Sequence, residues 1–308
     1  MRIIHLSLNN NNKLNIPICA CIGYFDGMHL GHQALLNETI KVAKEKSLSS
    51  GLITFNKDPW EVLYDETNIK HIGTLRQRIN FAIKHGIQNI ILLDFDKEMA
   101  MLEPEEFIAF IRERLNLKSL ICGFDFHYGN KGKGNPDRLK EIKDLDVYIV
   151  NAVSDEGGKI SSTRISEAIS KGDMISAYKM LGYPFTIEGN VIAGKHIGRG
   201  LGFPTANIEV DKEYLYPKEG VYCGFVRIGN DKYKAMINLG HNPSVNFTKE
   251  LSLEVHVIDY EGDLYNQLIC IEFIKFLRYE KKFINKDNLV MQLEQDKRDA
   301  RRILANYE

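Results

Sequence analysis

The chain has 308 residues, more than one hydrophobic core usually serves, so its length predicts two domains. Apolar residues make up 44% of it and charged residues 26%, which excludes a disordered, collagen-like or coiled-coil protein. The formal net charge of -1 leaves no global positive field for a nucleic-acid backbone, so an anionic ligand must be bound locally.

Targeting and redox features point to the cytoplasm. The clean apolar stretches, such as residues 90–93, are far shorter than the roughly 20 residues of a membrane span. The first residues lead into a polar run without the apolar core of a signal peptide, so we expect a cytoplasmic protein with no membrane partner. Five cysteines without a C-x-x-C pair favour reduced, mostly buried thiols over disulfides or zinc.

The first half of the chain alternates strand-like and helical patterns, which is typical of a parallel sheet covered by helices. The predicted strands are residues 16–22, 51–55, 90–95, 119–123 and 147–150, and the predicted helices are 31–45, 75–85 and 104–115. We therefore expect an α/β domain at the N-terminal end.

A helix predicted over residues 163–181 ends at Gly182, with Pro184 beyond it, so we place the domain boundary between residues 1–182 and 183–308. The second part is rich in β patterns separated by turn residues. Its predicted strands are 185–192, 220–228, 233–239, 251–258 and 267–277, followed by a helix over 288–306. This pattern predicts an antiparallel barrel or sandwich with a terminal helix.

The segment 23–32, GYFDGMHLGH, follows a predicted strand and opens a predicted helix. Unpaired N–H groups at a helix start form an anion site, and glycines permit close approach of a phosphate. His29 and His32, three residues apart, would lie near one another in the first helical turn. Taken alone, the two histidines could also be half of a metal site or a surface pair.

This segment resembles the HxGH nucleotidyltransferases, and the longer string G-x-F-D-G-x-H-x-G-H resembles their bacterial FAD synthetase branch. Residues 160–165, ISSTRI, match the I-S-S-T-R-I of that family, and residues 123–129, GFDFHYG, resemble its G-x-D-F-x-F-G. Without the resemblance, residues 161–163 are first a helix N-cap, and the two interpretations can coexist.

The resemblance implies adenylyl transfer, in which the phosphate of FMN attacks the α-phosphorus of ATP to give FAD and pyrophosphate. It implies catalytic roles for His29, His32 and Arg164 as hydrogen-bond donors to phosphate oxygens, and not as general bases. The residues that it places at the nucleotide are Gly23, Phe25, Asp26, Gly27, Gly31, Asp125, Ser161, Ser162 and Thr163.

The segment 54–59, TFNKDP, departs from the family's usual T-F-x-P-H-P near the flavin. Asp58 stands at the position of the histidine and Lys57 at that of the first proline, and Ser166 replaces an arginine that often follows the I-S-S-T-R-I segment. The resemblance implies that Asp58 and Pro59 lie at the flavin. The departures leave open a single-activity enzyme with a weakened or lost FAD synthetase site.

Residues 189–195 have the spacing of a P-loop, but His196 and the glycines that follow exclude the required helix. We interpret the match as chance and the segment as a glycine flap whose N–H groups close over phosphates. The flap residues expected at the nucleotide are Gly194, Lys195, Gly198 and Gly202.

Residues 198–208 strongly resemble the riboflavin kinase signature G-x-x-L-G-x-P-T-A-N. Thr205 and Asn207 alternate in an extended chain, so both side chains face one side and can bind one Mg²⁺. Further resemblances at residues 220–222, 238–244, 253–259 and 272–283 imply that Glu254 is the general base for the riboflavin 5′-hydroxyl and that Arg278 lies at the flavin. His256 shares the face of Glu254 and is expected to pack.

Together these segments identify the chain as a member of the bacterial bifunctional riboflavin kinase/FAD synthetase family. The family implies an α/β Rossmann-like nucleotidyltransferase domain followed by a six-stranded Greek-key flavokinase barrel. It also implies the route from riboflavin to FMN to FAD with ATP and Mg²⁺, and no nucleic-acid partner. A flavin- or nucleotide-sensing regulator on the same scaffold is the remaining alternative, against which the balanced charge speaks.

Overall fold

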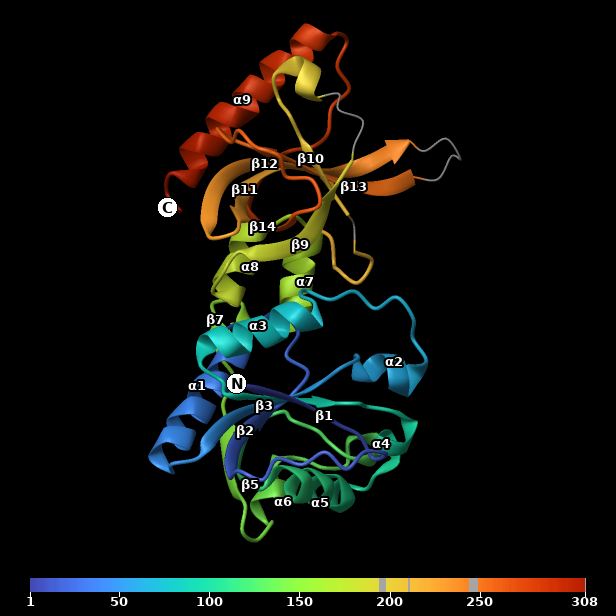
Figure 1. The fold of residues 1–308 in the computed structure, drawn as a ribbon, viewed down its shortest axis with the longest axis vertical. Coiled ribbons are helices and arrows are strands. Elements are labelled where there is room, and N and C mark those ends of the chain that lie inside the picture. The colour runs from blue at the N-terminus through green and yellow to red at the C-terminus, as the bar shows by residue number, and fades with distance from the viewer. Residues whose placement is uncertain (194–197, 210, 244–248, 308) are drawn as a thin grey trace. The chain divides into compact units, whose positions relative to one another are not determined.

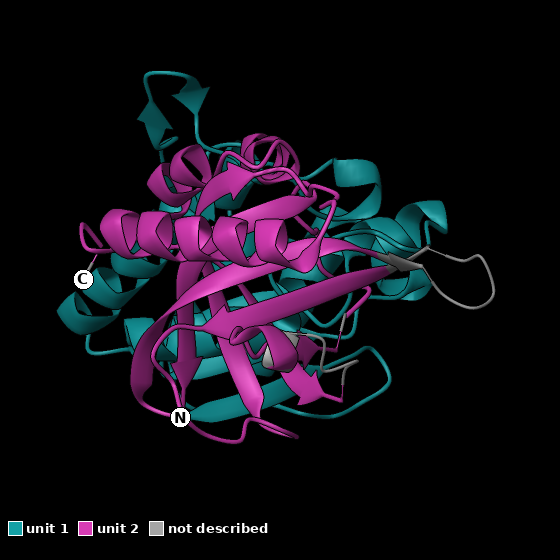
Figure 2. Cartoon of the chain, turned by 90° about the horizontal axis from the view of Figure 1, so that it is seen from above, with its two compact units in different colours: residues 1–162 teal, residues 163–308 magenta. Residues whose placement is uncertain are grey.

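A computed structural model describes residues 1–193, 198–209, 211–243 and 249–307 of the chain (Figure 1). The chain forms two compact units, residues 1–162 and 163–308 (Figure 2). Within the described residues, no helix combines the length and the apolar character needed to cross a membrane.

Unit 1 is built on a parallel sheet of six strands in the order β1-β4-β3-β2-β5-β6. The strands are β1 (Arg2–Leu6), β2 (Ile18–Ile22), β3 (Ser49–Phe55), β4 (Asn89–Leu93), β5 (Leu117–Gly123) and β6 (Asp146–Val150). The chain leaves β2 toward β3 on one side and leaves β5 toward β6 on the other. The carboxyl ends of β2 and β5 are therefore a topological switch point, where open α/β sheets bind ligands.

Helices connect these strands and cover the sheet. They are α1 (Leu30–Glu45), α2 (Pro59–Tyr64), α3 (Leu75–His85), α4 (Lys97–Met101), α5 (Pro104–Leu115) and α6 (Pro136–Lys140). Alternate residues of the buried strand β2 face opposite sides of the sheet. Ile18, Ala20 and Ile22 join the core that contains α5, whereas the Cys19 thiol lies 3.6 Å from the Thr39 carbonyl oxygen of α1.

The structure confirms the predicted α/β pattern and adds elements to it. It also contains strand β1, the short helices α2, α4 and α6, and the hairpin of β7 (Ser154–Asp155) and β8 (Gly158–Lys159), which the sequence does not predict. The prediction of a single helix over residues 163–181 is wrong, because the chain forms two helices there, α7 (Ser162–Ser170) and α8 (Met174–Leu181). Gly172 breaks the helix with a φ of 76°, and Asp173 caps α8 by accepting the N–H of Ser176.

Unit 2 contains a closed antiparallel barrel in the order β10-β13-β12-β11-β14-β9. Its strands are β9 (Phe185–Ile192), β10 (Ala206–Ile208), β11 (Gly220–Ile228), β12 (Asp231–Pro243), β13 (Lys249–Val257) and β14 (Leu268–Arg278). The neighbours β11, β12 and β13 follow one another in the chain, and β14 returns to pair with β11. This arrangement is the predicted Greek key.

The last helix, α9 (Lys286–Leu304), packs on the outside of the barrel. Its buried residues Ala300 and Leu304 join Phe225 and Met236 of the strands in one core cluster. The two compact units divide after Ser162, whereas the sequence places the boundary after Gly182. Helix α8 lies between these two positions and contacts β9 and β14.

The cysteines have the state that their number and spacing predict. The structure contains free thiols at Cys19, Cys21, Cys122, Cys223 and Cys270, and the first four are buried. Burial raises the pKa of the Cys19, Cys21 and Cys223 thiols to about 12. These thiols are therefore protonated, inert members of the core.

Candidate active sites

The first candidate site is a cavity of about 330 Å³ at the carboxyl ends of β2, β5 and β6. It lies at the topological switch point of the sheet. It brings together eight of the residues that the sequence places at the nucleotide or at the catalytic centre. These are Gly23, Phe25, His29, Gly31, His32, Asp125, Ser161 and Ser162.

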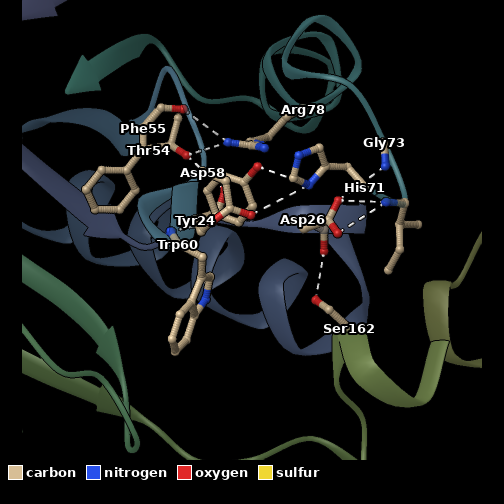
Figure 3. Close-up of polar contacts among 11 residues, drawn as sticks. Tyr24, Asp26, Thr54, Phe55, Asp58, Trp60, His71, Gly73, Arg78 and Ser162 are labelled. Atoms are coloured by element: carbon tan, nitrogen blue, oxygen red, sulfur yellow. Dashed lines mark hydrogen bonds and ion pairs between the residues drawn. The ribbon is translucent and has the colours of Figure 1, made fainter. Parts of the chain in front are cut away.

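The turn between β2 and α1 is shaped by left-handed backbone conformations at Phe25, Gly27 and Met28. A Cβ atom added at Gly27 would lie 2.9 Å from Ile72 Cγ2, so both the φ of 72° and the close approach require glycine. The half-buried carboxylate of Asp26 accepts the N–H groups of Ile72 and Gly73 (Figure 3). Asp26 and Gly27 thus hold the conformation of the turn. Neither residue lines the cavity, so their contact with a nucleotide stays a prediction.

His29 and His32 lie together as the spacing predicts. Their rings stack with centroids 3.6 Å apart, and His29 is only 6% exposed. His29 Nδ1 accepts the N–H of His32 and so caps α1, which leaves the ring proton on Nε2. Burial, reinforced by the charge of Lys159, lowers the pKa of His29 to about 4, and burial holds the pKa of His32 well below its ordinary value. Both rings are therefore neutral near pH 7, and His29 can still donate Nε2–H to a phosphate.

Lys159 is a functional candidate that the sequence analysis missed. It lines the cavity, forms an ion pair with Asp125 and places Nζ 4.9 Å from the centre of the Phe124 ring. The backbone of Lys159 is held by its pairing with Ser154 in a hairpin formed by β7 (Ser154–Asp155) and β8 (Gly158–Lys159). A lysine directly before the I-S-S-T segment was the available signal.

The I-S-S-T-R-I segment crosses the division between the two compact units. Ser161 and Ser162 line the cavity, and Ser162 Oγ donates to the Asp26 carbonyl oxygen over 3.1 Å (Figure 3). Thr163 and Arg164 belong to unit 2, in the first turn of α7. Their roles at the nucleotide stay predictions.

Asp58 and Pro59, expected at the flavin, form the start of α2. Asp58 caps the helix by accepting the Trp60 N–H over 2.8 Å and is 5% exposed, and Pro59 takes the first helical position. The second carboxylate oxygen of Asp58 lies 3.7 Å from His71 Nδ1 (Figure 3). Both residues lie outside the lining of the 330 Å³ cavity, so their contact with a flavin stays a prediction.

The second candidate site lies on the barrel and is bordered by α9. A cavity of about 600 Å³ is lined by Thr205, Glu254, His256, Arg278 and Leu293, among others. A neighbouring cavity of about 520 Å³ shares Thr205 and continues along Ala206 to Tyr260. Along β13 the first cavity is lined by Glu254 and His256 and the second by Val255 and Val257, so the two cavities use opposite faces of this strand.

Three polar residues form a row across adjacent strands of this site. Asn207 of β10 and Asn238 of β12 both lie directly opposite Glu254 of β13. Thr205 Oγ1 lies 3.4 Å from Glu254 Oε2, so the alternation of Thr205 and Asn207 does put both on the side of Glu254. A hydroxyl and an amide oxygen are ligands that Mg²⁺ accepts when phosphates complete its shell, and the carboxylate beside them is the one group of the row that can accept a proton.

His256 packs as expected, on the face that it shares with Glu254. Its Nδ1 donates to the Pro204 carbonyl oxygen over 2.8 Å, and its ring lies against Phe203. Burial lowers the pKa of His256. The imidazole therefore anchors the segment that carries Thr205.

Arg278 lines the 600 Å³ cavity but is also bonded to α9. Its Nε donates to Asp296 over 3.0 Å and its Nη2 over 2.6 Å, and the two side chains are 14% and 5% exposed. Gln292 donates to the same carboxylate. The pair fixes α9 against the barrel beside the cavity.

The glycine flap is described in part. Gly194 and Lys195 lie outside the described residues. Gly198 begins the 3-10 helix η3 (Gly198–Leu201), and Gly202 has a φ of 80°. The contacts of all four flap residues with a nucleotide stay predictions.

Site and fold together define a two-part nucleotide-using transferase. The family model for FAD synthetase matches residues 11–164, and the model for riboflavin kinase matches residues 181–304. A bifunctional riboflavin kinase/FMN adenylyltransferase of Listeria monocytogenes is 33% identical over 308 residues, covering 99% of this chain and 98% of that protein. One of Bacillus subtilis is 35% identical over 292 residues, covering 92% of each.

A solved structure from Streptococcus pneumoniae, described as a macrolide-efflux protein, is similar in fold with a TM-score of 0.88. It is 34% identical and covers 97% of this chain and 98% of its own. Its similarity extends over both units. The chain belongs to the family of bifunctional riboflavin kinase/FMN adenylyltransferases.

Proposed function

We propose that residues 1–182 adenylylate FMN to FAD and that residues 183–308 phosphorylate riboflavin to FMN, each with ATP. The observation that supports this division most directly is the presence of a separate site in each unit. The first holds paired imidazoles at a helix start, and the second holds a carboxylate beside two oxygen ligands on a barrel face.

In the kinase site, Glu254 accepts the proton of the riboflavin 5′-hydroxyl as the hydroxyl oxygen attacks the γ-phosphorus of ATP. The bond from that phosphorus to the bridging oxygen breaks, and ADP leaves. Thr205 and Asn207 would hold Mg²⁺, which supplies positive charge to the phosphate oxygens. Asn238 lies across from Glu254 and donates to Glu280 over 3.1 Å, so it continues the polar row along the cavity.

In the adenylyltransferase site, a phosphate oxygen of FMN attacks the α-phosphorus of ATP and pyrophosphate leaves. No proton must be removed from a phosphate that is already ionised, so the protein contributes position and donors. His29 donates Nε2–H, the start of α1 offers N–H groups, and Ser161, Lys159 and Arg164 bind the triphosphate. His32 supports the ring of His29 by stacking.

We propose a cytoplasmic enzyme whose partners are ATP and flavins, with no nucleic-acid partner. The net charge of -1 supports this proposal, because a nucleic-acid site needs a basic surface. The reduced state of the described cysteines also fits a reducing compartment.

Incubation with riboflavin and ATP·Mg, with chromatographic separation of FMN and FAD over time, tests the two activities. FMN should form first and FAD should follow. FMN without FAD, even when FMN is supplied at high enzyme concentration, would establish the single-activity alternative. Formation of neither product would overturn the proposed function.

A further inference from the structure

His71 lies between two segments of unit 1 that carry different parts of the proposed chemistry. Its Nδ1 is 3.3 Å from the Tyr24 hydroxyl and 3.7 Å from Asp58 Oδ2 (Figure 3). Tyr24 belongs to the turn between β2 and α1, and its chain neighbours Gly23 and Phe25 line the 330 Å³ cavity. Asp58 caps helix α2, which is expected at the flavin. One imidazole, with a side chain only 11% exposed, therefore bridges the nucleotide turn and the flavin segment.

The residues after His71 hold the same turn through the backbone. The Ile72 N–H donates to Asp26 over 3.1 Å, and the Gly73 N–H donates to it over 3.2 Å. The Ile72 side chain also fills the space beside Gly27. Asp26 and Gly27 thus depend on residues 71–73 for their position, as Tyr24 does.

Arg78 of α3 contacts the ring of Tyr24 and two residues at the end of β3. Its guanidinium lies 4.1 Å from the centre of the Tyr24 ring and donates to Thr54 Oγ1 and to the Phe55 carbonyl oxygen, each over 3.2 Å. Thr54 Oγ1 in turn donates to the Tyr24 carbonyl oxygen over 3.0 Å. Since Arg78 is 5% exposed and Thr54 is fully buried, this side of the turn is rigidly packed.

We propose that His71 is a positioning residue for adenylyl transfer, which fixes the flavin segment relative to the nucleotide turn through Asp58 and Tyr24. The proposal rests on the proposed FMN adenylylation. Because that reaction needs an in-line approach of two phosphates, a shift of about 1 Å between their binding segments costs up to about 10²-fold in rate. His71 lies outside the lining of the 330 Å³ cavity and contacts Tyr24 and Asp58, so we assign it an action through these neighbours.

Two variants of His71 separate positioning from packing. His71→Phe keeps the ring and removes the polar atoms, whereas His71→Asn keeps a polar atom near the place of Nδ1. For adenylylation of supplied FMN, we expect His71→Phe to lower kcat by about 10-fold or more with KM for ATP little changed. His71→Asn should recover most of kcat. Riboflavin phosphorylation in the same preparation should equal that of the parent enzyme and reports the amount of active unit 2, while the Tm of unit 1 reports whether the unit that carries His71 is folded.

His85→Phe is the matched control, because His85 lies on α3 in the same unit and contacts Asn37 and Phe81 away from the site. It should leave kcat unchanged. Parent-like kcat in His71→Phe, or an equal loss in the Phe and Asn variants with an equal drop in Tm, would overturn the positioning role. A parent enzyme that forms no FAD from FMN would overturn the proposed adenylylation together with it, which distinguishes the two failures.

Discussion

Glu254 of β13 lies directly opposite Asn207 of β10 in the antiparallel register of the barrel. The pairing places a carboxylate and an amide oxygen side by side, with the Thr205 hydroxyl 3.4 Å from the carboxylate. The register thus joins the proposed base to the two proposed magnesium ligands. Neither strand could form this site without the other.

Glu254→Gln should abolish FMN formation while FMN supplied from outside is still converted to FAD. The amide keeps the size of the side chain but cannot accept the proton, and loss of a general base costs about 10²- to 10⁴-fold in rate. Product chromatography with riboflavin or FMN as substrate measures both activities. Glu213→Gln, a change at an exposed glutamate of the same unit, should behave as the parent enzyme. Kinase activity retained in Glu254→Gln would remove Glu254 as the base.

His29 should make unit 1 less stable as the pH falls from about 6.5 to about 4. The unfolded histidine titrates near its ordinary pKa of about 6.5, whereas burial lowers the pKa of folded His29 to about 4. Between these values the unfolded chain binds the extra proton, so stability rises with pH by up to about 3 kcal/mol across the window.

Urea unfolding at several pH values measures this effect. Trp60, the single tryptophan of the chain, lies in unit 1 and reports its unfolding by fluorescence. The variant His29→Gln should lose the part of the pH dependence that belongs to His29. Equal slopes in the parent and the variant would contradict the neutral, buried imidazole.

The strands that could be predicted from the sequence are those marked by a local pattern of apolar residues and turns. The run of buried residues in β2 and the turn between β11 and β12 specify strands without knowledge of their partners. Strand β1 was not predicted because it lies at the edge of the sheet. Its exposed positions include the polar residues Arg2 and His5, so its sequence lacks the continuous apolar run of a buried strand.

The site was predicted where one segment carries several of its residues, and missed where single residues converge. His29 and His32 are three positions apart, and the helix start explains their contact. Lys159 meets Asp125 across 34 positions, and His71 meets Tyr24 across 47. Such contacts depend on the packing of the β7–β8 hairpin and of residues 71–73, which no local pattern encodes.

Lys159→Met should raise KM for ATP in adenylylation by about 10-fold or more, since a charge-assisted bond to phosphate contributes about 1.5–3 kcal/mol. Lys159→Arg should keep most of the affinity because it retains the charge. Lys171→Met, which removes an exposed lysine directly after α7 that pairs with Glu167 of that helix, is the matched control. Initial rates over a range of ATP concentrations, with riboflavin phosphorylation as an internal reference, give the comparison. An unchanged KM in Lys159→Met would exclude a contact with the triphosphate.

Asp296→Asn should destabilise unit 2 by up to about 3 kcal/mol, because it leaves the largely buried guanidinium of Arg278 without its charged partner. Since the pair holds α9 beside the 600 Å³ cavity, KM for riboflavin should rise as well. Asp299→Asn, which breaks an exposed pair with Arg302 on the same helix, should change neither quantity appreciably.

The double variant Arg278→Met/Asp296→Leu then separates the two roles of the arginine. An apolar pair of similar volume restores stability without restoring a charge in the cavity, because replacement of a buried ion pair by packed apolar residues is often neutral. If Arg278 also contacts the flavin, the double variant regains the Tm of the parent protein but keeps a raised KM for riboflavin. Parent-like values of both Tm and KM would show that Arg278 serves only to hold α9 in place. Calorimetric melting and riboflavin saturation curves on the same preparations decide between these results.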